Sequence, residues 1–238
     1  MARMNSTASN SKGSLTARGA QTRQRIIDTT AKLIYERGAE ATTLDEVCEA
    51  GRISRSQLYH YFEDKEALVR EVITLQANRI LAAQSPPIDE LDSIDALRRW
   101  AKTVEHLHRA SGGGGCPLGS LANELAHRSD GARILLQEGF RAWTDRLARG
   151  FERMQSRGDL DVDTSPTELA VAMVAAVEGG LLLAKTARSP APLKCALDMA
   201  LRYVGLHRRE SGIPGTRRQA ADRTRRKRRE PNGAGSAS

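Results

Sequence analysis

Residues 43–68 read TLDEVCEAGRISRSQLYHYFEDKEAL, and this stretch decides the fold. It opens with a capping box from Thr43 to Glu46, in which the threonine hydroxyl accepts from a first-turn amide and the glutamate reaches back to the cap. A second box runs from Ser54 to Gln57. Two short capped helices joined across residues 51–53 predict a helix-turn-helix.

The second of these helices presents a polar face to solvent. If Leu58 points inward, a turn of about 100° per residue places Ser56 and His60 on the opposite side. Gln57 and Tyr59 then lie on the flanks. Hydroxyl, amide and imidazole groups on short or rigid stems suit contacts with phosphates and with base edges.

The charge around this helix favours a polyanion. No carboxylate occurs from Ala50 to Phe62, whereas Arg52, Arg55 and His60 lie inside that window. A helix of this length is a rod of about 10–12 Å, which suits a major groove about 12 Å wide. The sequence therefore predicts a helix that reads DNA. The alternative is a small helical bundle whose surface carries these side chains by chance.

The remaining pattern is helical throughout, with almost no strand signal. Apolar residues recur at steps of three and four, and the breaks fall at glycine and proline, which predicts an all-α protein. We expect long helices at 21–37, 64–83, 92–110, 131–157, 166–187 and 191–209, and short helices at 43–50, 54–61 and 117–128.

Composition divides the chain into four parts. Both ends are small, polar and basic, and together they carry more than the whole net charge of +8. Segments of this kind cannot bury enough apolar surface to offset their ordering entropy. We expect a disordered basic arm at 1–20, a helix-turn-helix domain at 21–68, a second helical domain at 69–210 and a disordered arginine-rich tail at 211–238.

Several sequence patterns that would indicate a membrane protein, an exported protein or an enzyme do not occur. The longest apolar run, residues 169–177, is far shorter than the roughly 20 residues of a membrane span, and no leader-like pattern opens the chain. Three widely spaced cysteines favour free thiols in a reducing compartment. We expect a cytoplasmic protein with no membrane partner. We also expect no catalytic residue, metal or cofactor, because no nucleophile or metal-ligand pattern occurs, and His106 and His108 lie on different sides of a helix.

Residues 22–72 carry a resemblance to a known family. The run TRQRIIDTTAKLIYERGAEATTLDEVCEAGRISRSQLYHYFEDKEALVREV resembles the DNA-binding domain of the tetracycline-repressor (TetR) family of bacterial transcriptional regulators. The resemblance implies an all-helical homodimer with a C-terminal ligand-binding and dimerisation domain, here 69–210. In this family a small-molecule effector bound to that domain releases the DNA operator.

The resemblance also assigns roles to residues of the helix-turn-helix. Tyr59 and Lys65 match phosphate-contacting positions, and Thr43 presents a helix N-terminus to a phosphate. One departure is Arg52, which stands where the family usually has glycine in the turn, and which we expect to add a phosphate contact. The positions expected to touch bases or the backbone beside them are Ser54, Arg55, Ser56, Gln57 and His60.

An effector pocket is expected in the second domain. Its candidate lining residues are the aromatic Trp100, Phe140 and Trp143, for which simple core packing is the alternative. Cys116 follows four glycines and precedes Pro117, so we expect it to cap a helix whose dipole lowers the thiol pKa. Together with Lys185 it resembles an electrophile-sensing subgroup of the family.

The expected dimer surface lies near the C-terminus. Ala172, Ala176 and Gly180 form a small-residue stripe that lets another helix approach, and this helix pairs with 191–209. The function that follows is a ligand-responsive regulator, a repressor released from a pseudo-palindromic operator. Two alternatives stay open, namely a sequence-indifferent, architectural DNA binder using the tail motif RRKRR and an interaction module without DNA.

Overall fold

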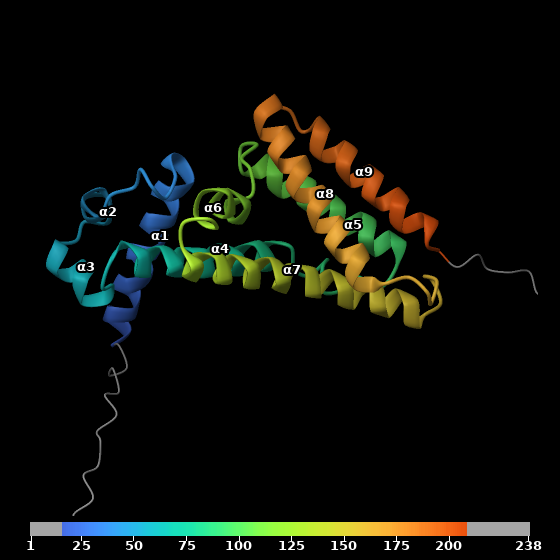
Figure 1. Ribbon diagram of the computed structural model, residues 1–238, viewed down its shortest axis with the longest axis horizontal. Helices are drawn as coiled ribbons and strands as arrows, with labels where there is room; N and C mark the ends of the chain where they lie inside the picture. The colour runs from blue at the N-terminus through green and yellow to red at the C-terminus, as the bar shows by residue number, and fades with distance from the viewer. Residues whose placement is uncertain (1–15, 209–238) are drawn as a thin grey trace, which may run out of the picture.

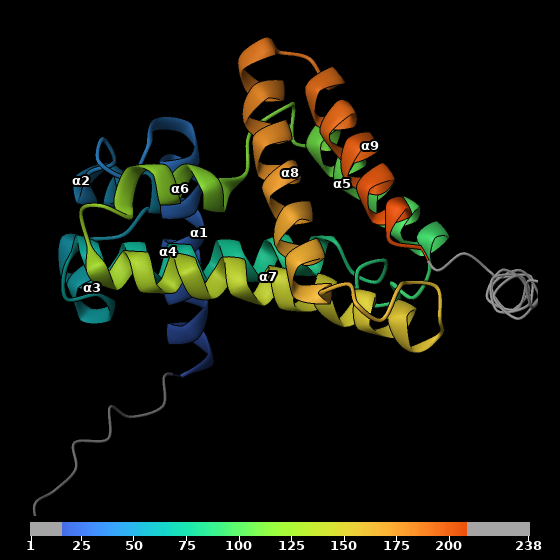
Figure 2. The same cartoon turned by 45° about the vertical axis from the view of Figure 1, so that its right-hand side comes forward.

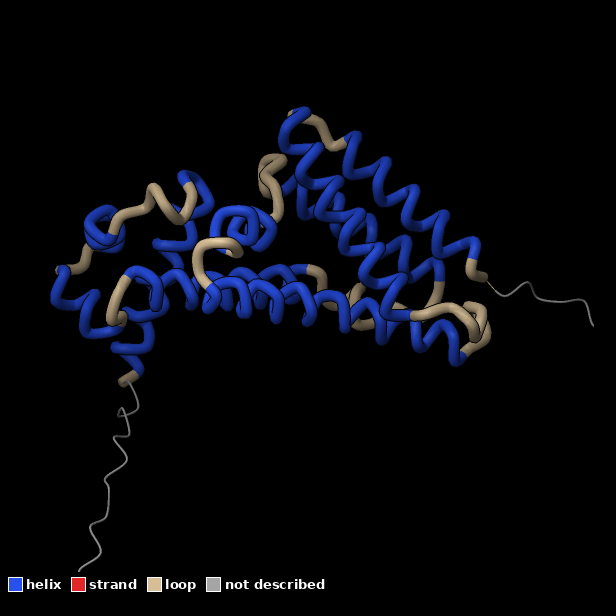
Figure 3. Tube along the Cα trace, in the orientation of Figure 1, coloured by secondary structure: helices blue, strands red, loops and turns tan. Residues whose placement is uncertain are grey.

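The computed structural model describes residues 16–208, so most of the expected arm and all of the expected arginine-rich tail lie outside the described residues. The described part is helical, with no strand and one isolated bridge between Leu160 and Arg208 (Figure 3). The helices are α1 (Ala17–Arg37), α2 (Leu44–Gly51), α3 (Arg55–Tyr61), α4 (Lys65–Ala83), α5 (Ile94–Ala110), α6 (Pro117–Leu125), α7 (Asp130–Ser156), α8 (Pro166–Ala187) and α9 (Ala191–Leu206).

The helix boundaries follow the local capping chemistry. Helix α1 starts earlier than expected, because Thr16 Oγ1 accepts from the amide of Gly19 and closes the first turn. The last residues of the expected disordered arm are therefore helical. Helix α1 ends at Gly38, whose φ of 90° suits glycine and whose amide donates to Ile34 O, as expected.

Helices α1, α2 and α3 form one end of the molecule (Figure 1). They enclose a small core in which Ile26 and Leu58 are fully buried and Phe62 nearly so. Helix α4 leaves this end and packs against α1 and then along α7. The two long helices lie side by side in both views, and they join the helix-turn-helix to the rest of the chain (Figures 1 and 2).

Helices α5, α8 and α9 form the other end, standing on the α4 and α7 pair (Figure 2). Gly180 of α8 sets the spacing to α9, because an added Cβ would lie 3.0 Å from Leu193 Cα. The small-residue stripe therefore admits a helix of the same chain at Gly180. Among the described helices, only α8 has the length and composition to cross a membrane; one of its faces is buried against α7 and α9.

Candidate DNA interface and ligand cavity

Both predicted capping boxes are present. The Ser54 amide donates to Gln57 Oε1 at 3.0 Å, and the Gln57 amide donates to Ser54 Oγ at 3.1 Å. The corresponding distances between Thr43 and Glu46 are 2.8 and 3.3 Å. These reciprocal bonds satisfy helix-end amides and hold α2 and α3 at fixed starting points.

The turn between α2 and α3 contains a residue in the left-handed backbone conformation, and this residue is not glycine. Arg52 has φ 51° and ψ 50°, and its amide donates to Glu49 O at 3.2 Å. The next amide, of Ile53, returns to Cys48 O at 3.0 Å. An arginine therefore adopts the turn geometry that glycine usually supplies. The backbone strain at this residue costs about 1 kcal/mol.

We expect Arg52→Gly to raise the free energy of unfolding by about 1 kcal/mol, because glycine adopts this conformation without strain. Arg52→Ala is the control, since it removes the same charge but retains the Cβ. Denaturant unfolding of the two variants measures the difference. Equal stability of the glycine and alanine variants would contradict strain at this position.

Helix α3 is oriented as its sequence predicts. Leu58 is 0% exposed, whereas Ser56 and His60 are exposed and Tyr59 is 50% exposed. Phe62 is buried, and the Arg23 guanidinium lies 5.3 Å from its ring centroid. The side chains expected to reach DNA therefore share an open face, and their contacts with DNA stay a prediction.

Besides the capping hydroxyls of Thr43 and Ser54, three of the expected contact residues already have protein partners. Arg55 Nε donates to Asp45 Oδ1 at 2.6 Å, and this hydrogen bond lowers the pKa of Asp45. Lys65 Nζ donates to Glu40 O at 3.0 Å. Gln57 uses its oxygen in the capping box, which leaves the amide nitrogen for a base. Asp45 engages Nε and Nη2 of Arg55, which leaves Nη1 of this exposed guanidinium without a protein partner within residues 16–208.

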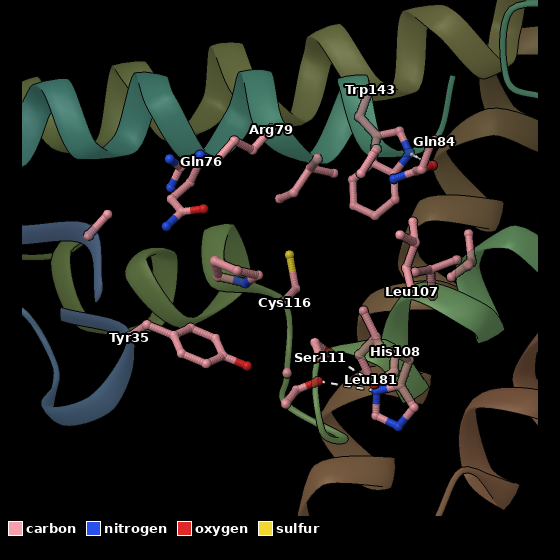
Figure 4. A pocket seen from close by; sticks show the side chains of 18 of the residues that line it. Tyr35, Gln76, Arg79, Gln84, Leu107, His108, Ser111, Cys116, Trp143 and Leu181 are labelled. Atoms are coloured by element: carbon pink, nitrogen blue, oxygen red, sulfur yellow. Dashed lines mark hydrogen bonds between the residues drawn. The ribbon is translucent and has the colours of Figure 1, made fainter. Parts of the chain in front are cut away.

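A cavity of about 520 Å³ lies between the two ends of the molecule. Its walls come from α1, α4, α5, α6, α7 and α8 and are mostly apolar (Figure 4). The polar side chains at its lining include Tyr35, Gln76, Gln84 and His108. A volume of this size is typical of small-molecule sites.

The expected pocket residues divide among three places. Trp143, one of the candidate lining aromatics, and Cys116, the candidate sensor, both line the cavity. Trp100 does not line it and is wholly buried, with its indole donating to Gln84 Oε1 at 2.7 Å. Phe140 and Lys185 line a separate hollow of about 410 Å³, which Cys116 also borders.

Sequence reasoning missed the glutamines of the cavity wall. Gln76 lies on α4 and Gln84 caps the C-terminus of this helix; both are buried, and both line the cavity with the apolar Ile80. Polar residues on an otherwise apolar helical stripe were the available signal, because buried amides need partners or a ligand.

Cys116 caps α6 as expected, with the Gly119 amide 3.4 Å from its sulfur. The predicted fall in its pKa is wrong. Burial raises the pKa of the thiol, since the side chain is 7% exposed, and the neighbouring Glu178 carboxylate raises it further. The thiolate needed for electrophile sensing is therefore disfavoured.

Glu178 is the buried carboxyl beside this thiol, and its Oε1 has no hydrogen-bond partner within residues 16–208. Burial raises the pKa of Glu178 above its ordinary value of 4.5. The folded protein therefore binds this proton more tightly than the unfolded chain does. The resulting stabilisation is complete below pH 4.5 and is lost as the pH rises through the raised pKa.

We expect Glu178→Gln to be more stable than the natural chain at about pH 8, by about 1 kcal/mol, because it removes the charge of a largely buried carboxyl whose Oε1 has no hydrogen-bond partner within residues 16–208. Near pH 4 the advantage should vanish, since both side chains are then neutral. Unfolding curves at the two pH values measure the effect. Glu138→Gln, at an exposed site on α7, is the control and should show no such pH dependence.

Comparison with known proteins matches both ends of the molecule. A model described as "Bacterial regulatory proteins, tetR family" matches residues 26–72, and one described as "Tetracyclin repressor-like, C-terminal domain" matches residues 94–200. The chain is 30% identical to the transcriptional regulator AcuR of Cereibacter sphaeroides over 71% of this chain and 79% of that protein. It is 25% identical to the transcriptional repressor DhaR of Mycobacterium sp. strain GP1, over 72% and 86% of the two chains.

Solved structures agree with this picture. The regulatory protein TetR from Rhodobacter sphaeroides superposes with a TM-score of 0.69 at 26% identity, over 79% of this chain and 99% of that chain. A TetR-family regulator from Cytophaga hutchinsonii reaches 0.74 at 20% identity, over 83% and 100%, and shows the shared fold. The fold and the exposed face of α3 define a helix-turn-helix DNA-binding transcriptional regulator. The chain belongs to the TetR family.

Proposed function

We propose that this regulator is a cytoplasmic, homodimeric repressor that leaves its operator when a small molecule fills the central cavity. The observation that carries the proposal is the position of the cavity. Its walls include α1, which packs against α2, and α4, which follows α3 in the chain and packs against α1. A ligand that changes the separation of α1 and α4 would change the orientation of the reading helix.

Helix α6 supplies a second connection between the cavity and the DNA-binding end. Its first residues, Cys116 and Pro117, line the cavity. Near its other end, the Glu124 carboxylate accepts from the amides of Ala39 and Glu40, with 2.8 Å to the first. A shift of α6 would therefore act directly on the segment between α1 and α2.

An exposed apolar face on α8 and α9 supports the homodimer. Large apolar side chains that would be unfavourable in water lie open along both helices, with Leu183 59% and Met199 60% exposed. A twofold axis through this face would pair two copies and set their reading helices about 34 Å, or a multiple of it, apart. The members of this face are Val171, Leu182, Leu183, Met199, Tyr203 and Leu206.

The repressor role draws on the name of one relative, DhaR, which is a transcriptional repressor. The sequence-indifferent alternative depends on the motif RRKRR, which lies outside the described residues. The relatives that match are transcriptional regulators, which does not favour that alternative.

Selection of bound duplexes from a random pool tests the proposal. The expected product is an inverted repeat with half-sites about one helical turn, or a multiple of it, apart. Deleting residues 211–238 provides the control, because it should lower affinity and salt dependence but leave the recovered sequence unchanged. Recovery of no common sequence, or loss of all binding on deletion, would contradict it.

A further inference from the structure

The cavity contains a buried amide whose orientation is fixed by two tryptophans. The indole nitrogens of Trp100 and Trp143 both donate to Gln84 Oε1, at 2.7 and 3.0 Å (Figure 4 shows the second). An indole nitrogen can only donate, so the oxygen of Gln84 must face the two rings. The Nε2 group, at the other end of the amide, therefore points away from the two indole nitrogens.

This Nε2 group is a donor without a protein acceptor. Gln84 is 4% exposed and lines the cavity, and no hydrogen bond within residues 16–208 uses its Nε2. This nitrogen is not among the fully enclosed side-chain atoms that lack a partner, so it opens on the cavity, where a ligand acceptor can pair with it. The groove-like wall beyond it is apolar, formed by Ile80, Leu107 and Leu181.

The charges at the cavity do not suit a cation. Asp28 is the acidic residue of the lining, and it is paired with Arg79 at 2.6 Å. Lys32 adds a second positive charge at the lining. His108 Nδ1 lies 3.1 Å from Gly114 O and donates to it. An ammonium ligand would find no free carboxylate here, whereas an acceptor-bearing ligand would meet the Gln84 amide.

We propose that the cavity binds apolar molecules that carry a carbonyl or carboxyl oxygen, and that Gln84 Nε2 donates to that oxygen. The inference rests on the proposed function, since it names the chemical class of the effector. The apolar body of the ligand lies along α4, α5 and α8. The two tryptophans hold the amide in place, so the donor is oriented before the ligand enters.

Three probes of equal carbon number test the class, namely methyl nonanoate, decanoate and decylamine. The chain contains 2 tryptophans, and both donate to Gln84, so intrinsic fluorescence reports on this site. In the natural protein, the ester and decanoate should bind at least about tenfold more tightly than decylamine, because a site built around a donor rejects ligands without an acceptor. Equal or tighter binding of decylamine would overturn the proposal, as would no response to the ester.

The substitution Gln84→Glu keeps an acceptor for both indoles and replaces the N–H donor by an oxygen. We expect it to weaken binding of the ester about tenfold or more, because the ester carbonyl then meets an acceptor. Binding of decylamine should become tighter, because its ammonium group can donate to the new carboxylate. Gln76→Glu is the matched control, since it places the same charge on the same wall of α4. It should weaken decanoate but leave the neutral ester within about threefold.

Binding of the uncharged ester distinguishes a directed hydrogen bond from a general electrostatic effect of the added charge. If both variants weaken it equally, or neither does, the proposed role of Gln84 is wrong. Thermal unfolding establishes that each variant folds. For the natural protein, the side-chain amide resonances of Gln84 provide an independent measurement, and they should shift with the ester and not with decylamine. The titrations contain no DNA, so failure of operator binding would leave their outcome unaffected.

Discussion

Replacing Ser56 and His60 together by alanine should lower affinity for the selected operator by about 100-fold, since the two base contacts expected of them would each be worth about 1–3 kcal/mol. The free energy of unfolding should change by less than about 0.5 kcal/mol, because both side chains are exposed on the face of α3 opposite the buried Leu58. Gel retardation on the operator and on a scrambled duplex measures the loss. The loss should be confined to the operator.

Two comparisons make this result specific. His106→Ala, an exposed histidine on α5, should leave DNA binding unchanged. Lys65→Ala, at an expected phosphate contact, should weaken all duplexes alike and lower the salt slope by about 1. If the double variant weakened the operator and the scrambled duplex equally, Ser56 and His60 would not read bases.

The largest effect on stability is expected at Gly180. Valine there should cost about 3 kcal/mol or more, because its Cβ would lie 3.0 Å from Leu193 Cα and 3.1 Å from Ala196 Cβ. The clash involves backbone, so the two helices must separate. Since the face formed by α8 and α9 is also the proposed dimer surface, the variant should lose dimerisation together with stability.

Gly179→Val is the matched control for this position. An added Cβ at Gly179 meets nothing within 4 Å, so its fold should keep its stability within about 0.5 kcal/mol. Denaturant unfolding at one fixed protein concentration compares the two variants. Equal destabilisation at both glycines would contradict the close approach of α9 as the reason that position 180 requires glycine.

Much of the fold was predictable because it depends on neighbours in sequence. The capping boxes at Thr43 and Ser54 join residues three apart, and the inward position of Leu58 follows from helical periodicity alone. The left-handed turn at Arg52 was the exception. An arginine occupies it because the boxes and the buried core on either side fix the path of the chain.

The ligand cavity was predictable only in part. Sequence reasoning chose aromatic residues, and Trp143 lines the cavity but Trp100 packs in the core. Both rings are buried and each donates to the same oxygen of Gln84, but only Trp143 of the two borders the cavity. Whether an aromatic side chain borders a cavity depends on helices brought together from distant parts of the chain. The periodicity of apolar residues within one helix carries no such information.

The sequence by itself determined the local elements, namely the helices, their caps and the polar face of α3, because these depend on residues within one or two turns. Only the tertiary structure decided the chemistry of the buried groups. Burial, together with Glu178 on α8, raises the pKa of the Cys116 thiol, whereas the helix dipole alone would lower it. Gln84 gains its fixed orientation from Trp143, 59 residues away. Desolvation and long-range hydrogen bonding act between elements, so they exist only once the chain has folded.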